Sequence, residues 1–234
     1  MLSSESDMAN RRVRRSPRPR QQRRRAFTLL ETMLALVIIG VGVLAFVDAQ
    51  SAFVRSNNWS SQAATGMLLA NEIRELTRTL PRHDPVTGLS LQGTGTGATV
   101  VGWGRESGEV TLDDIDDLDD LDGMSFGSGG TLDGPVNAAG EQVPEINADG
   151  VPVVDGDGNP VFLQGWWQLV TVEKLDPYNF GLVRTRGYEQ AATSSLPYLA
   201  VDRFPLRITV SVRYQGMSDS QAEEVTKMTW IVLP

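Results

Sequence analysis

The chain of 234 residues contains no cysteine and only one histidine. The absence of cysteine excludes a disulfide framework, a thiolate zinc site and a thiol nucleophile. The single histidine, His83, follows a helix-ending Pro81 closely, which leaves little for a histidine-based catalytic triad. The sequence also lacks a phosphate-binding glycine loop, a metal-ligand cluster and a convincing catalytic pair. We therefore expect a protein that is not an enzyme and that needs no cofactor.

The stretch that follows Ala26 has almost no charged residues and no proline. The 21 residues from Phe27 to Val47 include a single charged side chain, Glu31, and no proline occurs between Phe27 and Pro81. An apolar helix of about 20 residues is long enough to span a membrane. A carboxylate inside such a segment costs about 2.5–3.5 kcal/mol even on lenient insertion scales, so Glu31 indicates a function.

Positive charge is concentrated before this stretch. Residues 1–26 contain nine arginines and two acidic residues, whereas the remaining residues contain 12 basic and 27 acidic side chains. A nucleic-acid-binding tail would explain the arginines. The adjoining apolar run favours the positive-inside rule instead, with residues 1–26 in the cytoplasm and no nucleic-acid partner.

The apolar pattern predicts a helix that continues beyond the membrane, over residues 27–80 with about 27–47 transmembrane. After the apolar run, apolar residues recur in steps of three and four, which is typical of one helical stripe. The stripe consists of Trp59, Ala63, Met67, Ala70, Ile73, Leu76 and Leu80. Pro81 is expected to end the helix.

Residues 81–234 have the composition of a β-rich globular domain. Residues 82–160 are rich in Gly, Asp and Pro and predict loops, with a short strand near 99–103 and hairpins around 151–163. Alternating or β-branched segments predict strands at 166–173, 206–214 and 225–233. We expect an α+β fold, in which the long helix packs on a small antiparallel sheet.

Two acidic segments are candidates for cation binding. The run at residues 113–122 clusters carboxylates, which hard cations prefer, but it lacks the spacing of an EF-hand. We interpret it as a solvated, flexible loop, so that calcium is only a secondary expectation. The segment at 155–159 resembles the start of a calcium loop, but Pro160 and Trp166 replace the required glycine and glutamate, which favours a hairpin turn.

The junction between the arginines and the apolar run reads Ala-Phe-Thr-Leu-Leu-Glu at residues 26–31. It resembles the class III signal of type IV pilins and type II secretion pseudopilins. The resemblance implies that a prepilin peptidase cuts between Ala26 and Phe27 and methylates Phe27. It also implies that Glu31 pairs with the N-terminal amine of a neighbouring subunit during assembly. The family usually has glycine before the cut, where this chain has alanine, which is also small.

The segments at 31–42 and 61–73 are similar to PilV-type minor pilins and I-class minor pseudopilins. The resemblance implies other pilin or pseudopilin subunits and an inner-membrane assembly platform as partners. It implies a single pass through the inner membrane, with the C-terminal domain outside the cytoplasm, before incorporation into a pilus or a secretion pseudopilus.

The N-terminal segment also fits two signals of a different kind. Arg24 and Arg25 fit the core of a twin-arginine export signal, and a plain signal anchor would account for the length of the apolar run. Either would give an exported or anchored binding domain unrelated to filaments. Neither accounts for Glu31.

Overall fold

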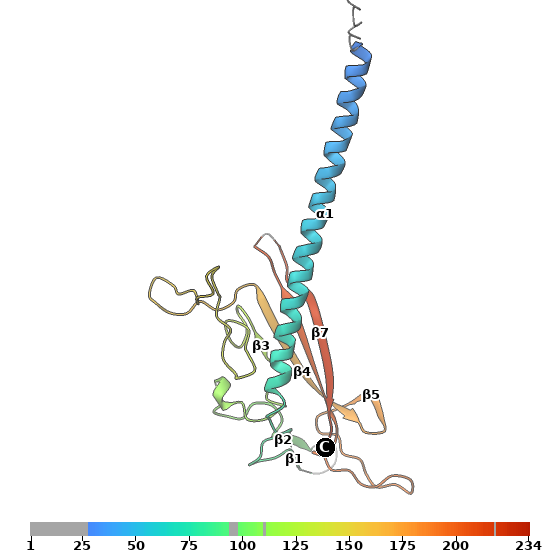
Figure 1. Ribbon diagram of the computed structural model, residues 1–234. Helices are drawn as coiled ribbons and strands as arrows, with labels where there is room; N and C mark the ends of the chain where they lie inside the picture. Colours follow the sequence, from blue (N-terminus) through green and yellow to red (C-terminus); the bar gives the residue numbers. More distant parts are fainter. Residues whose placement is uncertain (1–27, 94–97, 110, 218) are drawn as a thin grey trace, which may run out of the picture. The chain divides into compact units, whose positions relative to one another are not determined.

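A computed structural model describes residues 28–93, 98–109, 111–217 and 219–234 (Figure 1). The basic segment 1–26 and Phe27 lie outside the described residues. The chain divides into two compact units, residues 1–53 and 54–234. A single helix, α1 (Leu29–Leu76), begins in the first unit and ends in the second.

Helix α1 begins and ends at residues whose side chains bond its free backbone groups. At the start, the Thr28 hydroxyl accepts a hydrogen bond of 3.4 Å from the Glu31 backbone N–H, as an N-cap residue does. At the end, the Thr77 hydroxyl donates to the Arg74 carbonyl at 2.7 Å. The helix therefore stops at Leu76, one turn before the end expected from Pro81.

The second unit contains a five-stranded antiparallel sheet in the order β3-β4-β6-β7, with β5 also paired to β4. Its strands are β3 (Ser125–Phe126), β4 (Trp166–Asp176), β5 (Asn179–Arg184), β6 (Leu206–Tyr214) and β7 (Glu223–Val232). A separate pair consists of β1 (Ser90–Gln92) and β2 (Thr99–Val101), and a short 3₁₀ helix is η2 (Leu112–Asp114).

The core lies between one face of this sheet and the last turns of α1. Alternate residues of β4 and β6 are buried there, and they share one cluster with Leu69, Ala70 and Ile73 of the helix. Period-two alternation on the strands and a helical stripe are complementary ways of building one apolar face. The predicted α+β fold, with a long helix packed on an antiparallel sheet, is confirmed.

Two residues fix how closely the helix approaches the sheet. A Cβ atom on Gly66 would lie 3.1 Å from Cγ1 of Val225, so only glycine fits easily against β7. Gln168 of β4 is fully buried, and its amide donates to the Leu69 carbonyl of α1 at 2.8 Å. The same side chain donates to the Val136 carbonyl and accepts from the Val136 N–H. Helix, sheet and loop are thus joined by one side chain.

The buried stripe of the helix differs from the predicted one. Gly66, Leu69, Ala70 and Ile73 are the buried helix residues. Trp59 and Met67, which the pattern assigned to the buried face, are 67% and 55% exposed. The prediction was wrong there for two reasons. Apolar residues in steps of three and four fit two neighbouring faces of a helix equally well, so the pattern does not show which face is buried. The pattern also left out glycine, although Gly66 lies on the buried face.

The predicted hairpins at 151–163 are present only as turns with isolated bridges, such as Val154 to Pro160 and Ile146 to Pro152. The side chain of Asp155 accepts hydrogen bonds from the backbone N–H groups of Asp157 and Asn159, both at 2.9 Å. This carboxylate is engaged in its own turn, which agrees with the preference for a hairpin turn over a calcium loop at 155–159.

Candidate functional site

The first candidate site is the apolar half of α1. Every residue from Thr28 to Phe53 is exposed, including large side chains such as Leu29 (80%) and Leu44 (67%). By length and composition the helix can cross a membrane. Fully burying one such side chain is worth about 1.5–3 kcal/mol. The segment therefore presents a long apolar surface that requires lipid or other apolar helices.

Polar side chains in this half of the helix mostly bond locally. The Thr32 hydroxyl donates to the Leu29 carbonyl at 2.8 Å, and the Ser51 hydroxyl donates to the Val47 carbonyl at 2.9 Å. Such bonds within the helix make a hydroxyl tolerable in an apolar environment. The Glu31 carboxylate, by contrast, has no partner among the described residues.

Glu31 occupies the third helical position after the capping residue Thr28. Thr-x-x-Glu is the pattern of a capping box, in which the glutamate can reach back to the backbone of the cap. A negative charge in the first turn also interacts favourably with the helix dipole. Of the two bonds of such a box, the structure contains the one from the Glu31 N–H to the Thr28 hydroxyl, whereas the carboxylate makes no bond to a described residue. The expected cleavage and methylation positions, Ala26 and Phe27, lie outside the described residues and stay predictions.

The second candidate site is the acidic run. Its interpretation as a solvated, flexible loop is wrong, because Asp117, Asp119 and Asp120 are each at most 2% exposed. The apolar residues at every third position, Leu118 and Leu121 among them, are buried in the core and draw the intervening carboxylates inward. Long-range backbone bonds hold the run: the Leu118 N–H donates to the Pro81 carbonyl at 2.9 Å.

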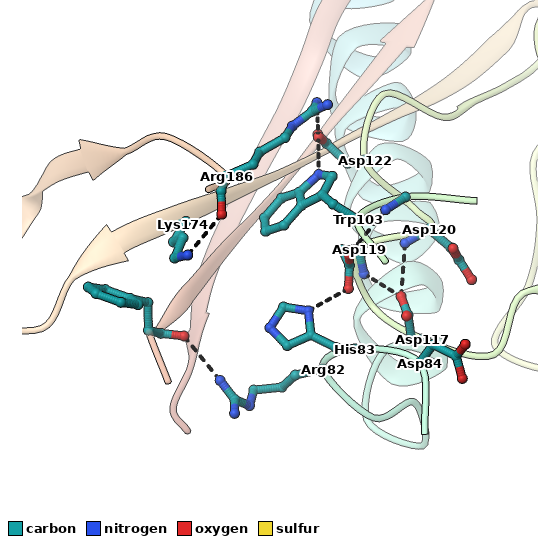
Figure 2. A network of polar contacts seen from close by, with 12 residues as sticks. Arg82, His83, Asp84, Trp103, Asp117, Asp119, Asp120, Asp122, Lys174 and Arg186 are labelled. Atoms are coloured by element: carbon teal, nitrogen blue, oxygen red, sulfur yellow. Dashed lines mark hydrogen bonds and ion pairs between the residues drawn. The ribbon is translucent and has the colours of Figure 1, made fainter. Parts of the chain in front are cut away.

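Asp122 connects this run to the sheet, and Figure 2 shows its contacts with Trp103 and Arg186. Its Oδ1 accepts from the Val172 N–H of β4 at 3.0 Å, and its Oδ2 accepts from the Trp103 indole at 3.2 Å. The Arg186 guanidinium forms an ion pair with the same Oδ2. Asp122 is therefore fully engaged in structural bonds.

His83 pairs with Asp119 at 2.8 Å between Nδ1 and Oδ1, with side chains 7% and 0% exposed. Oδ2 of Asp119 accepts from the Gly104 N–H at 3.1 Å. The pair joins the segment after α1 to the acidic run (Figure 2).

A third set of carboxylates in this region was missed by the sequence pattern. Oxygens of Glu106, Glu109 and Asp120 lie within 4.8 Å of one another. Burial, followed by the charge of Glu109, raises the pKa of Glu106 above its ordinary value. Burial, again followed by Glu109, raises the pKa of Asp120 to about 6. Glu106 and Glu109 precede the acidic run, so no local signal joined them to it.

Comparison with known proteins gives one match. The model of the prokaryotic N-terminal methylation motif matches residues 21–47, which span the expected cut, Glu31 and all of the apolar run from Phe27 to Val47. No curated protein and no solved structure gives a significant match to the chain. The match and the long apolar helix together fit a membrane-anchored protein. The chain carries a type IV pilin-type N-terminal signal.

Proposed function

We propose that this protein is a minor pilin or pseudopilin subunit and not an enzyme. A prepilin peptidase would cut between Ala26 and Phe27 and methylate Phe27. The helix would then assemble with other subunits through the inner-membrane platform. One observation carries the proposal: the methylation motif opens directly onto a helical segment whose residues from Thr28 to Phe53 are all exposed.

The chemistry of Glu31 supports assembly through this segment. In a bundle of apolar helices, an unpaired carboxylate is costly and requires a cation or a hydrogen-bond donor. Cleavage before Phe27 would create an amine close to Glu31 in sequence, and the same amine on each neighbouring subunit. Pairing between subunits would fix the axial register of the helices, which is the best-attested use of a buried ion pair.

The arginines support one orientation. Nine arginines within residues 1–26 would hold that end in the cytoplasm. The unit formed by residues 54–234 would then lie outside the cytoplasmic membrane and contribute surface or tip contacts in a pilus or a secretion pseudopilus.

Processing is tested by expressing the chain with and without a prepilin peptidase and determining the mature mass and N-terminus by mass spectrometry. We expect a mature chain that begins with N-methylated Phe27 only when the peptidase is present. An uncut chain would indicate a signal anchor, and a cut after the apolar run would indicate an export signal. Either result contradicts the proposal.

The role of Glu31 is tested with Glu31→Gln, which removes the charge but retains a capping-box side chain. We expect normal membrane insertion and at least a roughly tenfold loss of incorporation into filaments, equivalent to about 1.4 kcal/mol. Asp48→Asn is the matched control, because it removes another exposed carboxylate of the same helix. Normal incorporation of Glu31→Gln would rule out the assembly role.

A further inference from the structure

The structure contains buried carboxylate oxygens that have no hydrogen-bond partner among the described residues. Both carboxylate oxygens of Glu106 and Oδ1 of Asp120 are buried without a hydrogen-bond partner. Asp120 itself is 2% exposed. A buried acceptor, above all a charged one, is rarely left unsatisfied, so each such atom requires an explanation.

The remaining oxygens of this group are held in place by backbone donors. Glu109 Oε2 accepts from the Glu106 N–H at 2.7 Å, and Asp120 Oδ2 accepts from the Asp116 N–H at 3.3 Å. These bonds orient the carboxylates and leave Asp120 Oδ1 and the Glu106 oxygens for another ligand. Asp116 and Asp117 add a second group around the same Asp120, again with oxygens within 4.8 Å of one another.

The charged groups nearest to Glu106 add repulsion to the cost of burying its carboxylate. The strongest charges acting on Glu106 are those of Glu109, Asp120 and Asp84, and all three are negative. The Asp84 pKa is lowered, chiefly by a hydrogen bond from the Thr87 hydroxyl, so that this neighbour stays ionised. Clustered carboxylates in a buried site repel one another unless protons or a cation neutralise them.

The basic side chains of the adjoining network are directed to other partners. The guanidinium of Arg82 donates to the Phe204 carbonyl, His83 pairs with Asp119, and Arg186 pairs with Asp122 (Figure 2). These three groups do not supply the missing positive charge. A metal ion would supply it.

We propose that Glu106, Glu109 and Asp120 bind one calcium ion. The ligand set consists only of carboxylate oxygens, which hard cations prefer, whereas zinc and softer metals prefer nitrogen and sulfur. Calcium accepts an irregular set of six to eight oxygens, and Asp116 and Asp117 are close enough to extend it. Magnesium demands near-octahedral geometry and suits such a set less well. The inference does not depend on the proposed function, since these residues lie within the unit 54–234.

Bound calcium would join two segments that differ in structural role. Glu106 and Glu109 belong to the connection after β2, and Asp120 belongs to the acidic run over Leu118 and Leu121 of the core. Binding to the folded state alone stabilises it by mass action. The globular unit should therefore unfold at a higher temperature when calcium is present.

The test uses the full chain, purified in a nonionic detergent and treated with a chelator. Calcium is titrated in by isothermal calorimetry, and thermal unfolding is compared in chelator and in about 5 mM CaCl₂, which exceeds the weakest affinities common for extracellular sites. We expect one binding event and a clear rise in the melting temperature. The absence of both would overturn the proposal.

Variants separate a ligand role from a structural one. Glu106→Gln should lower calcium affinity at least about tenfold. A loss of about this size is typical even for residues that only hydrogen-bond to a metal ligand. The Glu106→Gln variant should fold normally in chelator, with a melting temperature equal to or above that of the unmodified chain, because it removes repulsion between buried carboxylates. Asp120→Asn should behave in the same way.

Asp113→Asn is the matched control, because Asp113 is an exposed member of the same acidic run and belongs to neither carboxylate group. It should bind calcium as the unmodified chain does. An equal loss of calcium affinity in Asp113→Asn would show that general surface charge causes the loss, and it would contradict the proposed site. An equal rise in melting temperature with MgCl₂ would overturn the assignment to calcium.

Discussion

The two candidate regions depart from the usual distribution of side chains, in which apolar groups are buried and charged groups are exposed. In residues 28–53, large apolar side chains are exposed, whereas in the region of Glu106 and Asp120, carboxylates are buried. Each arrangement is unfavourable for an isolated chain in water, and each specifies the chemistry that would relieve it. The helix requires an apolar surface, and the carboxylates require protons or a cation. Unsatisfied groups are therefore the most informative features of this molecule.

The comparison also separates two kinds of information. The apolar exposure of the helix follows directly from consecutive residues. The burial of the carboxylates follows from tertiary contacts, since the apolar residues between them enter the core. Three predictions test this contrast between residues outside and inside the core.

The largest effect is expected for a matched pair of phenylalanines. Phe126 is 0% exposed, and Phe46 is 62% exposed. Phe126→Ala should lower the free energy of unfolding of the globular unit by about 3–5 kcal/mol, because it removes a large core side chain. Phe46→Ala should change that free energy by less than about 0.5 kcal/mol. Denaturant unfolding in detergent measures both, and similar losses would remove the distinction between the regions.

The next effect depends on pH and concerns Lys174, which is 1% exposed. Burial lowers the pKa of Lys174 from 10.5 to about 8. Between these values Lys174 binds more protons in the unfolded state than in the folded state, so its contribution to stability should rise with pH across this window, by up to about 3 kcal/mol at ~1.4 kcal/mol per unit. Denaturant unfolding at a series of pH values measures the rise, and Lys174→Met should abolish it.

Lys227, the other lysine of the chain, is exposed and provides the control. Lys227→Met should retain the rise in stability between pH values of about 8 and 10.5. A profile in the unmodified chain that rises no more than that of Lys174→Met would show that Lys174 is better solvated than its burial implies.

The smallest effect is expected for Gln168. Gln168→Leu keeps the volume but leaves the Leu69 carbonyl and both backbone groups of Val136 without this partner. The loss should be about 1–3 kcal/mol in the free energy of unfolding. Gln164→Leu, at an exposed glutamine shortly before β4, should cost less than about 0.5 kcal/mol. Equal costs would show that the buried amide bonds contribute nothing specific.

Much of the fold was predictable because its signals are local. The alternation at 206–214 predicted the bounds of β6, and the absence of proline predicted one long helix. Strand β5 was missed because its residues are mostly exposed and carry no alternation. The burial of the acidic run was missed because the backbone groups that hold it, at Pro81 and Val170, lie far from it in the sequence.

The candidate sites divide in the same way. The methylation signal lies within consecutive residues, and sequence alone was enough to recognise it. The pairing of His83 with Asp119 spans 36 positions, and Glu106 meets Asp120 across η2. Contacts between residues that are distant in the sequence cannot be predicted from the pattern of neighbouring residues. Their roles became visible only with burial and distances.

The amide of Gln168 has a mechanical consequence. It ties the Leu69 carbonyl of α1 to β4, the strand that pairs with three others. A pulling force along the helix would therefore pass through this bond into β4 and spread over β3, β5 and β6. The load would be shared among several strands and would not fall on one edge strand alone.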